Sequence, residues 1–187
     1  MAYATLTSIK RYLGISESTD DTLLTVTAEA ATSMIDRLTN RTFTATADST
    51  RYHGADCVVG EMLYLDGDLC AITSVTNGDG VAVASTEYKS MPRNYTPYFA
   101  LALDDDSAVS WDTDSGEIAI VGKWAWSLTP PADIEFACVR LTSYLYRQKD
   151  NMGELDRAMI AGNTTLLPAE LPKDIMLILA PYRRKAA

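Results

Sequence analysis

The sequence predicts an α+β protein that is mainly helical: a small helical bundle with an inserted antiparallel β excursion and a C-terminal tail segment. Helical spacing of apolar residues recurs in three segments, 5–14, 20–40 and 131–149. Between about 50 and 121 this spacing disappears, and short apolar runs alternate with turn residues. A proline-interrupted apolar stretch with a basic end follows. We therefore expect one domain over 1–149 and a separate segment over 150–187.

The segment 131–149 carries the clearest helical signals of the chain. Thr129 is a candidate N-cap, and the two prolines after it suit a first helical turn. Acidic residues lie near its start and basic residues near its end, which suits the helix dipole. One face is almost wholly apolar, and it comprises Ile134, Ala137, Cys138, Leu141, Tyr144, Leu145 and Gln148.

Two further helices precede it at the N-terminus. In the first, Thr5 or Thr7 can cap the start and Gly14 can end it. Ser18 or Thr19 can cap the second, and Asn40 is a plausible stop. Its expected inner face is Leu23, Leu24, Thr27, Ala31, Met34, Ile35 and Leu38. Because each long helix needs a partner for its apolar face, we predict one core made of Leu24, Ala31, Ile35, Leu38, Ile134, Cys138, Leu141 and Leu145.

Turn residues predict where the strands of the β excursion begin and end. A run at 63–65 is expected to end at Asp66-Gly67-Asp68, and Asn77-Gly78-Asp79-Gly80 predicts a hairpin between 71–76 and 81–85. Pro92 and Pro97 make 88–98 an irregular link or an edge strand. Residues 98–103 and 117–121 complete the set of expected strands.

Composition narrows the possible functions. The net charge of −9 argues against affinity for a nucleic-acid phosphate backbone. Cys57, Cys70 and Cys138 form no zinc or disulfide pattern, so we expect reduced thiols in a cytoplasmic setting. No apolar run is long enough to cross a bilayer, and the N-terminus lacks a signal-peptide pattern. No cofactor motif is present, so we expect none to bind.

Several residues could carry chemistry, each with a plainer structural interpretation. His53 is the only histidine, and pairing with Cys57 as a nucleophile is conceivable from spacing alone. The aspartates at 104–106, 112 and 114 could bind a divalent cation, although their spacing does not fit an EF-hand loop. The aromatic residues could form a sugar-stacking platform, or they could pack in a core or an interface; they are Trp111, Trp124, Trp126 and Tyr98.

The order of these parts resembles the head–tail adaptor proteins of tailed phages, also called head-completion or connector proteins. The similarity is carried by LTSIKRYLGI at 6–15 and DDTLLTVTAEAATSMIDRLTNRTF at 20–43. It continues in TRYHG at 50–54, LDGDL at 65–69 and SVTNGDG at 74–80, and then in Tyr88, Pro92, Asn94, Pro97 and Tyr98. Residues 118–126, 131–134 and 145–148 match the end of the adaptor domain.

The resemblance implies a structural virion protein at the head–tail interface that is assembled in the bacterial host cytoplasm and is not an enzyme. It implies a homo-oligomeric, dodecameric ring beneath the portal protein. DNA would pass through without specific binding, and the ring would receive a stopper, tail terminator or tail tube protein. A small β-rich binding module of a phage tail and a hydrolase using Asp and His remain the alternatives.

Two sets of residues are predicted to serve this role. The first is a portal-docking element that is ordered only in the complex, over 171–185: Leu171, Ile175, Ile178, Leu179, Arg183, Arg184 and Lys185. The second is an acidic set that faces the channel or its rim and keeps DNA from sticking: Asp104, Asp105, Asp106, Asp112, Asp114 and Glu117. The β excursion is expected to contact a neighbouring subunit or the next tail component.

Overall fold

The structure is a computed structural model that describes residues 2–149, 159–161, 164–166 and 171–184. The chain divides into two compact units. The helical unit comprises Met1–Asn40 and Pro131–Ala187, and the sheet unit comprises Arg41–Pro130. This division differs from the expected boundary at 149/150, because the described residues 171–184 belong with the helices.

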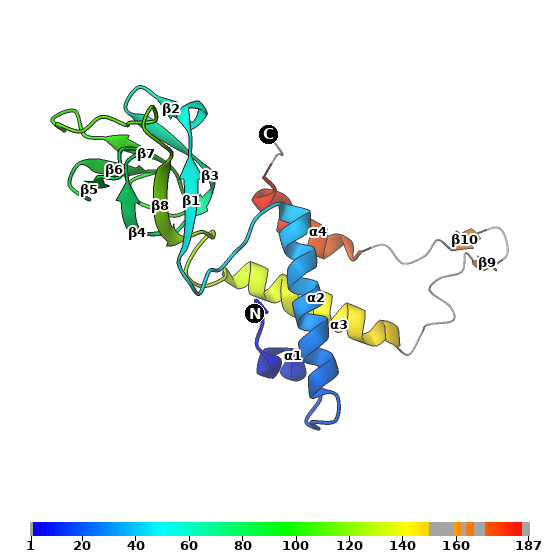
Figure 1. Ribbon diagram of the computed structural model, residues 1–187. Coiled ribbons are helices and arrows are strands. Elements are labelled where there is room, and N and C mark those ends of the chain that lie inside the picture. The colour runs from blue at the N-terminus through cyan, green and yellow to red at the C-terminus, as the bar shows by residue number, and fades with distance from the viewer. Residues whose placement is uncertain (1, 150–158, 162–163, 167–170, 185–187) are drawn as a thin grey trace. The chain divides into compact units, whose positions relative to one another are not determined.

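The fold is not mainly helical, so the expected fold class was wrong. Helix accounts for 36% of the structure and strand for 25%. In the described part of the chain there are four α-helices and two antiparallel sheets of four strands each, beside one two-stranded hairpin (Figure 1). The β region is thus a unit with its own core, because its strands pair across long sequence separations that local turn signals do not reveal.

The two N-terminal helices begin and end close to the predicted residues. Helix α1 spans Leu6–Leu13, where the Thr5 side chain accepts a hydrogen bond from the Ser8 backbone N–H at 3.1 Å. Gly14 ends it in the left-handed conformation, with φ of 72°. Helix α2 spans Asp21–Thr39 and ends at Asn40, which is also left-handed, with φ of 53°. The N-cap of α2 is Asp20, without a side-chain cap hydrogen bond, so the expected cap at Ser18 or Thr19 was wrong. The start of α1 and the ends of both helices match the sequence because capping is a local property.

Helix α3, Ala132–Gln148, lies at the centre of the helical unit and packs against α1, α2 and α4 (Figure 1). Its N-cap position is Pro131, not Thr129, and no side chain caps it. Helix α4 spans Lys173–Leu179. The core contains six of the eight predicted residues, while Leu38 and Leu145 are half-buried. Buried apolar side chains of the four helices are Ile9, Leu24, Ala28, Ala31, Ile35, Ile134, Ala137, Cys138, Val139, Leu141, Ile175 and Leu179.

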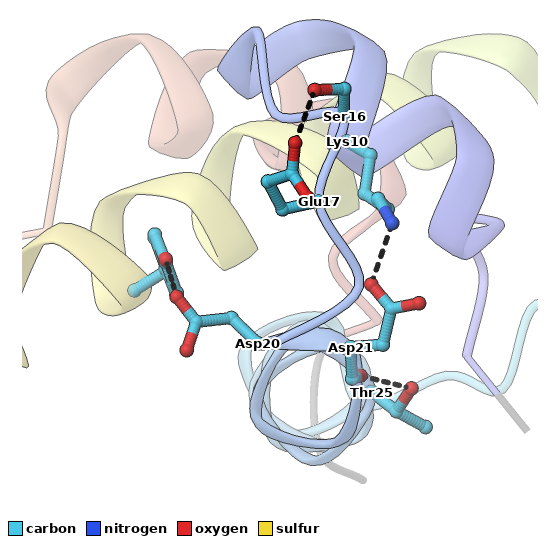
Figure 2. Close-up of polar contacts among 7 residues, drawn as sticks. Lys10, Ser16, Glu17, Asp20, Asp21 and Thr25 are labelled. Atoms are coloured by element: carbon cyan, nitrogen blue, oxygen red, sulfur yellow. Dashed lines mark hydrogen bonds and ion pairs between the residues drawn. The ribbon is translucent and has the colours of Figure 1, made fainter.

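Polar contacts fix the connection between α1 and α2 (Figure 2). Lys10 Nζ lies 2.7 Å from the Asp21 carboxylate, and the Thr25 hydroxyl donates to the Asp21 carbonyl at 2.8 Å. Asp20, before the first turn of α2, accepts hydrogen bonds from the Tyr146 hydroxyl and from Lys149 Nζ. These two donors lower the pKa of Asp20. The end of α3 is therefore tied to the start of α2.

The sheet unit contains two antiparallel sheets. The first has the strand order β1-β8-β4-β5 and the second β2-β3-β7-β6. The strands are β1 (Ser49–His53), β2 (Val58–Val59), β3 (Met62–Leu69), β4 (Ala71–Thr76), β5 (Ala82–Val83), β6 (Tyr88–Met91), β7 (Tyr98–Leu103) and β8 (Ile118–Lys123). One hydrophobic core joins both sheets, made of Leu63, Leu65, Leu69, Val75, Val83, Leu101, Leu103, Ile118, Ile120 and Trp124. A separate hairpin pairs β9 (Met159–Ala161) with β10 (Thr164–Leu166).

Strand β3 shows why the β region was underestimated. Asp66-Gly67-Asp68, expected as a turn, lies inside this eight-residue strand. Exposed and buried positions alternate along it, so that Asp66 points outward between the buried Leu65 and Gly67. Asp66 and Asp68 form ion pairs with Arg51 at 2.9 Å and Arg41 at 2.6 Å. Basic residues distant in the sequence therefore allow this polar segment to remain extended.

Candidate assembly surfaces

The hairpin tip and one acidic loop form a single locked structure at one end of the sheet unit. The Asn77 side chain donates to the Ser110 carbonyl at 2.8 Å and accepts from the Asp112 N–H at 2.9 Å. The Gly78 N–H donates to the Asp112 carbonyl at 3.1 Å. A Cβ at Gly78 would lie 2.2 Å from that carbonyl oxygen, so only glycine fits this approach. The predicted hairpin is confirmed, but the residue of its turn with a positive φ is Gly80, at 83°, and not Asn77 or Gly78.

The predicted acidic set is spread over two loops with different environments. Asp104 pairs with Lys89 at 2.5 Å, and this hydrogen bond lowers the pKa of Asp104. Asp112 accepts from the Asp114 and Ser115 N–H groups, and the Ser115 contacts lower the pKa of Asp112. Asp104 and Asp112 thus stabilise their own loops. The exposed acidic side chains are Asp105, Asp106, Asp114 and Glu117.

Asp112 and Asp114 line an open cavity of about 500 Å³ together with Asp79 and Trp111. Within the described residues, no group of three or more His, Cys, Asp or Glu side chains could hold a metal ion. The acidic loops therefore present negative surface.

His53 and Cys57 do not have the electrostatic environment of a nucleophile pair. Burial lowers the pKa of His53, although the nearby Asp66 carboxylate opposes this. Burial raises the pKa of the Cys57 thiol, which works against the thiolate that nucleophilic attack requires. The His53 ring stacks on Trp124, with ring centroids 5.7 Å apart. Its position is that of a packed residue inside the sheet unit.

The aromatic residues considered as a sugar platform are used within the sheet unit. Trp124 is buried in the core, and the Arg51 guanidinium lies 4.5 Å from its ring centroid. Trp126 contacts Phe43 and the Arg41 guanidinium. Trp111 and Tyr98 pack against the core from its margin, and the Trp111 indole donates to the Glu61 carbonyl at 2.9 Å. The rings therefore serve packing.

The C-terminal segment is already packed in the single chain, so the expectation that it is ordered only in a complex needs correction. Ile175 and Leu179 are completely buried in the helical unit. The Arg184 N–H donates to the Thr39 carbonyl at 2.8 Å, at the end of α2. Leu171 and Ile178 are half-buried, and Arg183 is exposed. Lys185 lies outside the described residues. The physical reason is that α4 covers apolar surface on α3 that would otherwise face water.

Other apolar side chains are exposed although the sequence did not predict it. Val26 on α2 is 59% exposed, Phe136 on α3 is 47% exposed and Leu177 on α4 is 74% exposed. On α2, Leu23 is also exposed, although it was expected on the inner face. The available signal was the number of apolar positions on α2, which exceeds what one buried stripe can accommodate. No helix in the described chain is long and apolar enough to span a membrane.

Comparison with known proteins shows which solved structures share this fold. The structure is similar to chains in three solved particle structures. In the neck of an empty gene transfer agent (GTA) particle computed with C6 symmetry, the TM-score is 0.63 at 16% identity, over 99% of this chain and 91% of that one. For a chain in a native GTA virion, the TM-score is 0.64 at 14% identity, over 99% of this chain and 91% of that one. For a chain in a native GTA neck computed with C12 symmetry, the TM-score is 0.61 at 15% identity, over 97% of this chain and 89% of that one. At these identities the likeness shows a shared fold.

No curated protein matches the sequence. The sequence profile of the family described as "Head completion protein" matches residues 3–185, which include both units and α4. Because this match spans nearly the whole chain, the protein belongs to the head completion protein family and is a structural connector between phage head and tail.

Proposed function

We propose that twelve copies of this chain form a ring beneath the portal of a filled head and present the attachment surface for the next tail component. The observation that carries the proposal is the family match over residues 3–185. The similar GTA neck structures, computed with C6 and C12 symmetry, support a ring. The next component would be a stopper, tail terminator or tail tube protein. The role is structural and requires neither a cofactor nor a reaction.

The proposal is tested with heads that carry portal but lack this protein. Purified protein is added, and the heads are separated from free protein by sedimentation and imaged by negative-stain microscopy. Added density in the form of a ring below the portal, with restored tail joining, is the expected result. Heads that stay bare at saturating protein would contradict the proposal. Heads that already carry the ring are the control, because they should take up no more protein.

For portal docking, we propose the exposed residues of the described C-terminal segment, Lys173, Leu177 and Arg183, together with the half-buried Arg184 and with Lys185, which lies outside the described residues. Ile175 and Leu179 are in the core, so a truncation that removes α4 would destabilise the fold as well as remove a docking surface. A sharper test is Leu177→Asp combined with Arg183→Glu, since both side chains are exposed. We expect unchanged thermal unfolding and weaker attachment to heads. Unchanged attachment would exclude these two positions.

For the channel, we propose that Asp105, Asp106, Asp114 and Glu117 line the lumen or its rim. These exposed carboxylates would repel the phosphate backbone, and so DNA would pass without binding. Replacing all four by Asn or Gln should leave ring assembly intact and increase retention of DNA on isolated rings at low salt. A variant that neutralises exposed carboxylates outside this set and outside the surfaces proposed to join subunits, Glu17 and Glu61, is the control. Equal DNA retention by both variants would contradict the assignment.

A further inference from the structure

Helix α2 carries two apolar stripes, and the described chain buries only one of them. The inner stripe consists of Leu24, Ala28, Ala31 and Ile35, each nearly or completely buried. The outer stripe consists of Leu23, Val26, Ala30 and Met34, which recur at spacings of three and four residues. Leu23 is 42% exposed, Val26 is 59% exposed, and Ala30 is exposed. The outer stripe is therefore an apolar ridge on a helix that is already packed on its other side.

A complementary surface lies elsewhere on the same helical unit, between α1 and α3. The rings of Tyr12 and Phe136 meet edge to face, with centroids 6.3 Å apart, and both are more than two-fifths exposed, at 43% and 47%. They border a cavity of about 360 Å³ that is also lined by Ala132 and Val139. Tyr12 also borders a second cavity, of about 220 Å³. This Tyr12–Phe136 groove is a shallow, open depression, where the outer stripe is a ridge.

Opposite charges flank the two surfaces. Within the Tyr12–Phe136 groove, the Glu135 carboxylate accepts a hydrogen bond from the Ser8 hydroxyl at 3.4 Å. Glu29 lies beside the outer stripe on α2, and Arg11 lies on the wall of the groove. Neither side chain forms an ion pair with another described residue. The chain carries a net charge of −9, so two copies repel each other unless apolar contact and a local opposite charge offset that repulsion.

We propose that the outer stripe of one copy seats in the Tyr12–Phe136 groove of the next copy, and that this contact closes the ring. The occupant is thus a second copy of this chain, and the inference rests on the ring proposed above. A closed ring needs a heterologous interface in which two different surfaces of each subunit meet. The outer stripe and the groove are two such surfaces, and both lie within one compact unit. The small Ala30 between larger residues gives an aromatic ring of the neighbour room to approach.

Cysteine pairs test which surfaces meet. The parent variant is Cys57→Ser, because Cys70 and Cys138 are buried. Val26→Cys or Ala30→Cys is combined with Tyr12→Cys or Phe136→Cys, and each variant is oxidised both on portal-bearing heads and in concentrated solution. We expect at least one pair to give a ladder of disulfide-linked multimers. Each single variant should give none, because the interface joins different residues.

Absence of a ladder in both settings, for all four pairs, would overturn the proposal. So would a cross-link from Val26→Cys to the portal instead of to a second copy. Attachment of the parent protein to heads is measured separately. If the parent attaches but no ladder forms, the interface is wrong while the proposed function stands. If a ladder forms in solution but the parent never attaches to heads, the interface stands while the proposed function is wrong.

Charge reversal gives an independent test with a built-in rescue. Glu29→Arg alone and Arg11→Glu alone should each raise the concentration for half-maximal ring formation about two- to fivefold. The double variant should return it toward the parent value, because the pair is restored with opposite polarity. Val26→Asp places a charge in the apolar contact and should raise that concentration about tenfold or more. Unchanged assembly by Val26→Asp, or no rescue by the double variant, would overturn the contact.

Discussion

The Tyr182 hydroxyl lies 2.8 and 3.0 Å from the two carboxylate oxygens of Asp133 and so ties the end of the described chain to the first turn of α3. Partial burial, followed by the Asp133 contact, raises the pKa of Tyr182 to about 12. Two residues after Tyr182, the Arg184 backbone N–H donates a hydrogen bond to the Thr39 carbonyl at the end of α2. These contacts hold the C-terminal segment on the helical unit before any partner is present.

The first prediction concerns this packing. Leu179→Ala should lower the free energy of unfolding of the helical unit by about 2–5 kcal/mol, because Leu179 is completely buried. Urea unfolding followed by circular dichroism at 222 nm measures it. Leu177→Ala is the matched control, since this leucine is 74% exposed and its loss should change stability by less than about 0.5 kcal/mol. Equal effects of the two substitutions would show that α4 does not pack as described.

A second prediction concerns the contact between α2 and α3. Leu141 is completely buried, so Leu141→Ala should cost about 2–5 kcal/mol. All three tryptophans lie in the sheet unit, at 111, 124 and 126. Tryptophan fluorescence therefore reports that unit, while the 222 nm signal reports mainly the helices. We expect the substitution to shift the 222 nm transition. A shift in tryptophan fluorescence alone would contradict the assignment of Leu141 to the helical core.

The sequence predicted the helices well and the sheets poorly, for different physical reasons. Thr5, Gly14 and Asn40 act within one turn of their helices, so local reading found the ends of α1 and α2. Strand β3 depends on Arg51 and Arg41, whose pairing with its aspartates no local pattern reveals.

The assembly surfaces were only partly predictable, as α2 illustrates. Apolar periodicity placed both Leu23 and Leu24 on the inner face, yet only Leu24 is buried. Periodicity counts apolar positions, but it cannot distinguish a residue that meets its own chain from one left for a partner. For the C-terminal segment, the proline boundaries favoured a short helix, but whether it packed on its own chain was not decided by its sequence.

The third prediction concerns the locked tip of the sheet unit. Gly78→Ala should destabilise this unit by about 1–3 kcal/mol, because the added methyl group would clash with the Asp112 carbonyl. Tryptophan fluorescence during urea unfolding measures it. Gly54→Ala is the control: its φ of −91° is accessible to alanine, and the added carbon would meet only the Asp56 side chain, at 3.1 Å. If both variants unfold at the same urea concentration, the close approach at Gly78 does not constrain the tip.

The last prediction concerns acid sensitivity of the sheet unit. His53 is buried, and burial lowers its pKa below the ordinary 6.5; Arg51 adds to the effect, while Asp66 and Asp56 oppose it. The unfolded chain therefore binds more protons than the folded chain once the pH falls below about 6.5, so stability decreases with acidification through that range. The contribution of His53 is fully present above pH 6.5 and is lost as the pH falls toward its folded-state pKa. His53→Phe keeps an aromatic ring beside Trp124 but cannot be protonated.

We therefore expect the parent to lose more stability than His53→Phe between pH 7.5 and 5. Urea unfolding followed by tryptophan fluorescence, with both proteins at each pH, gives the difference and cancels the shared titration of carboxylates. The Leu141→Ala variant is a useful control, because it should retain the parent's pH dependence in this signal. Parallel pH profiles for the parent and His53→Phe would mean that His53 is no more difficult to protonate in the folded chain than in water.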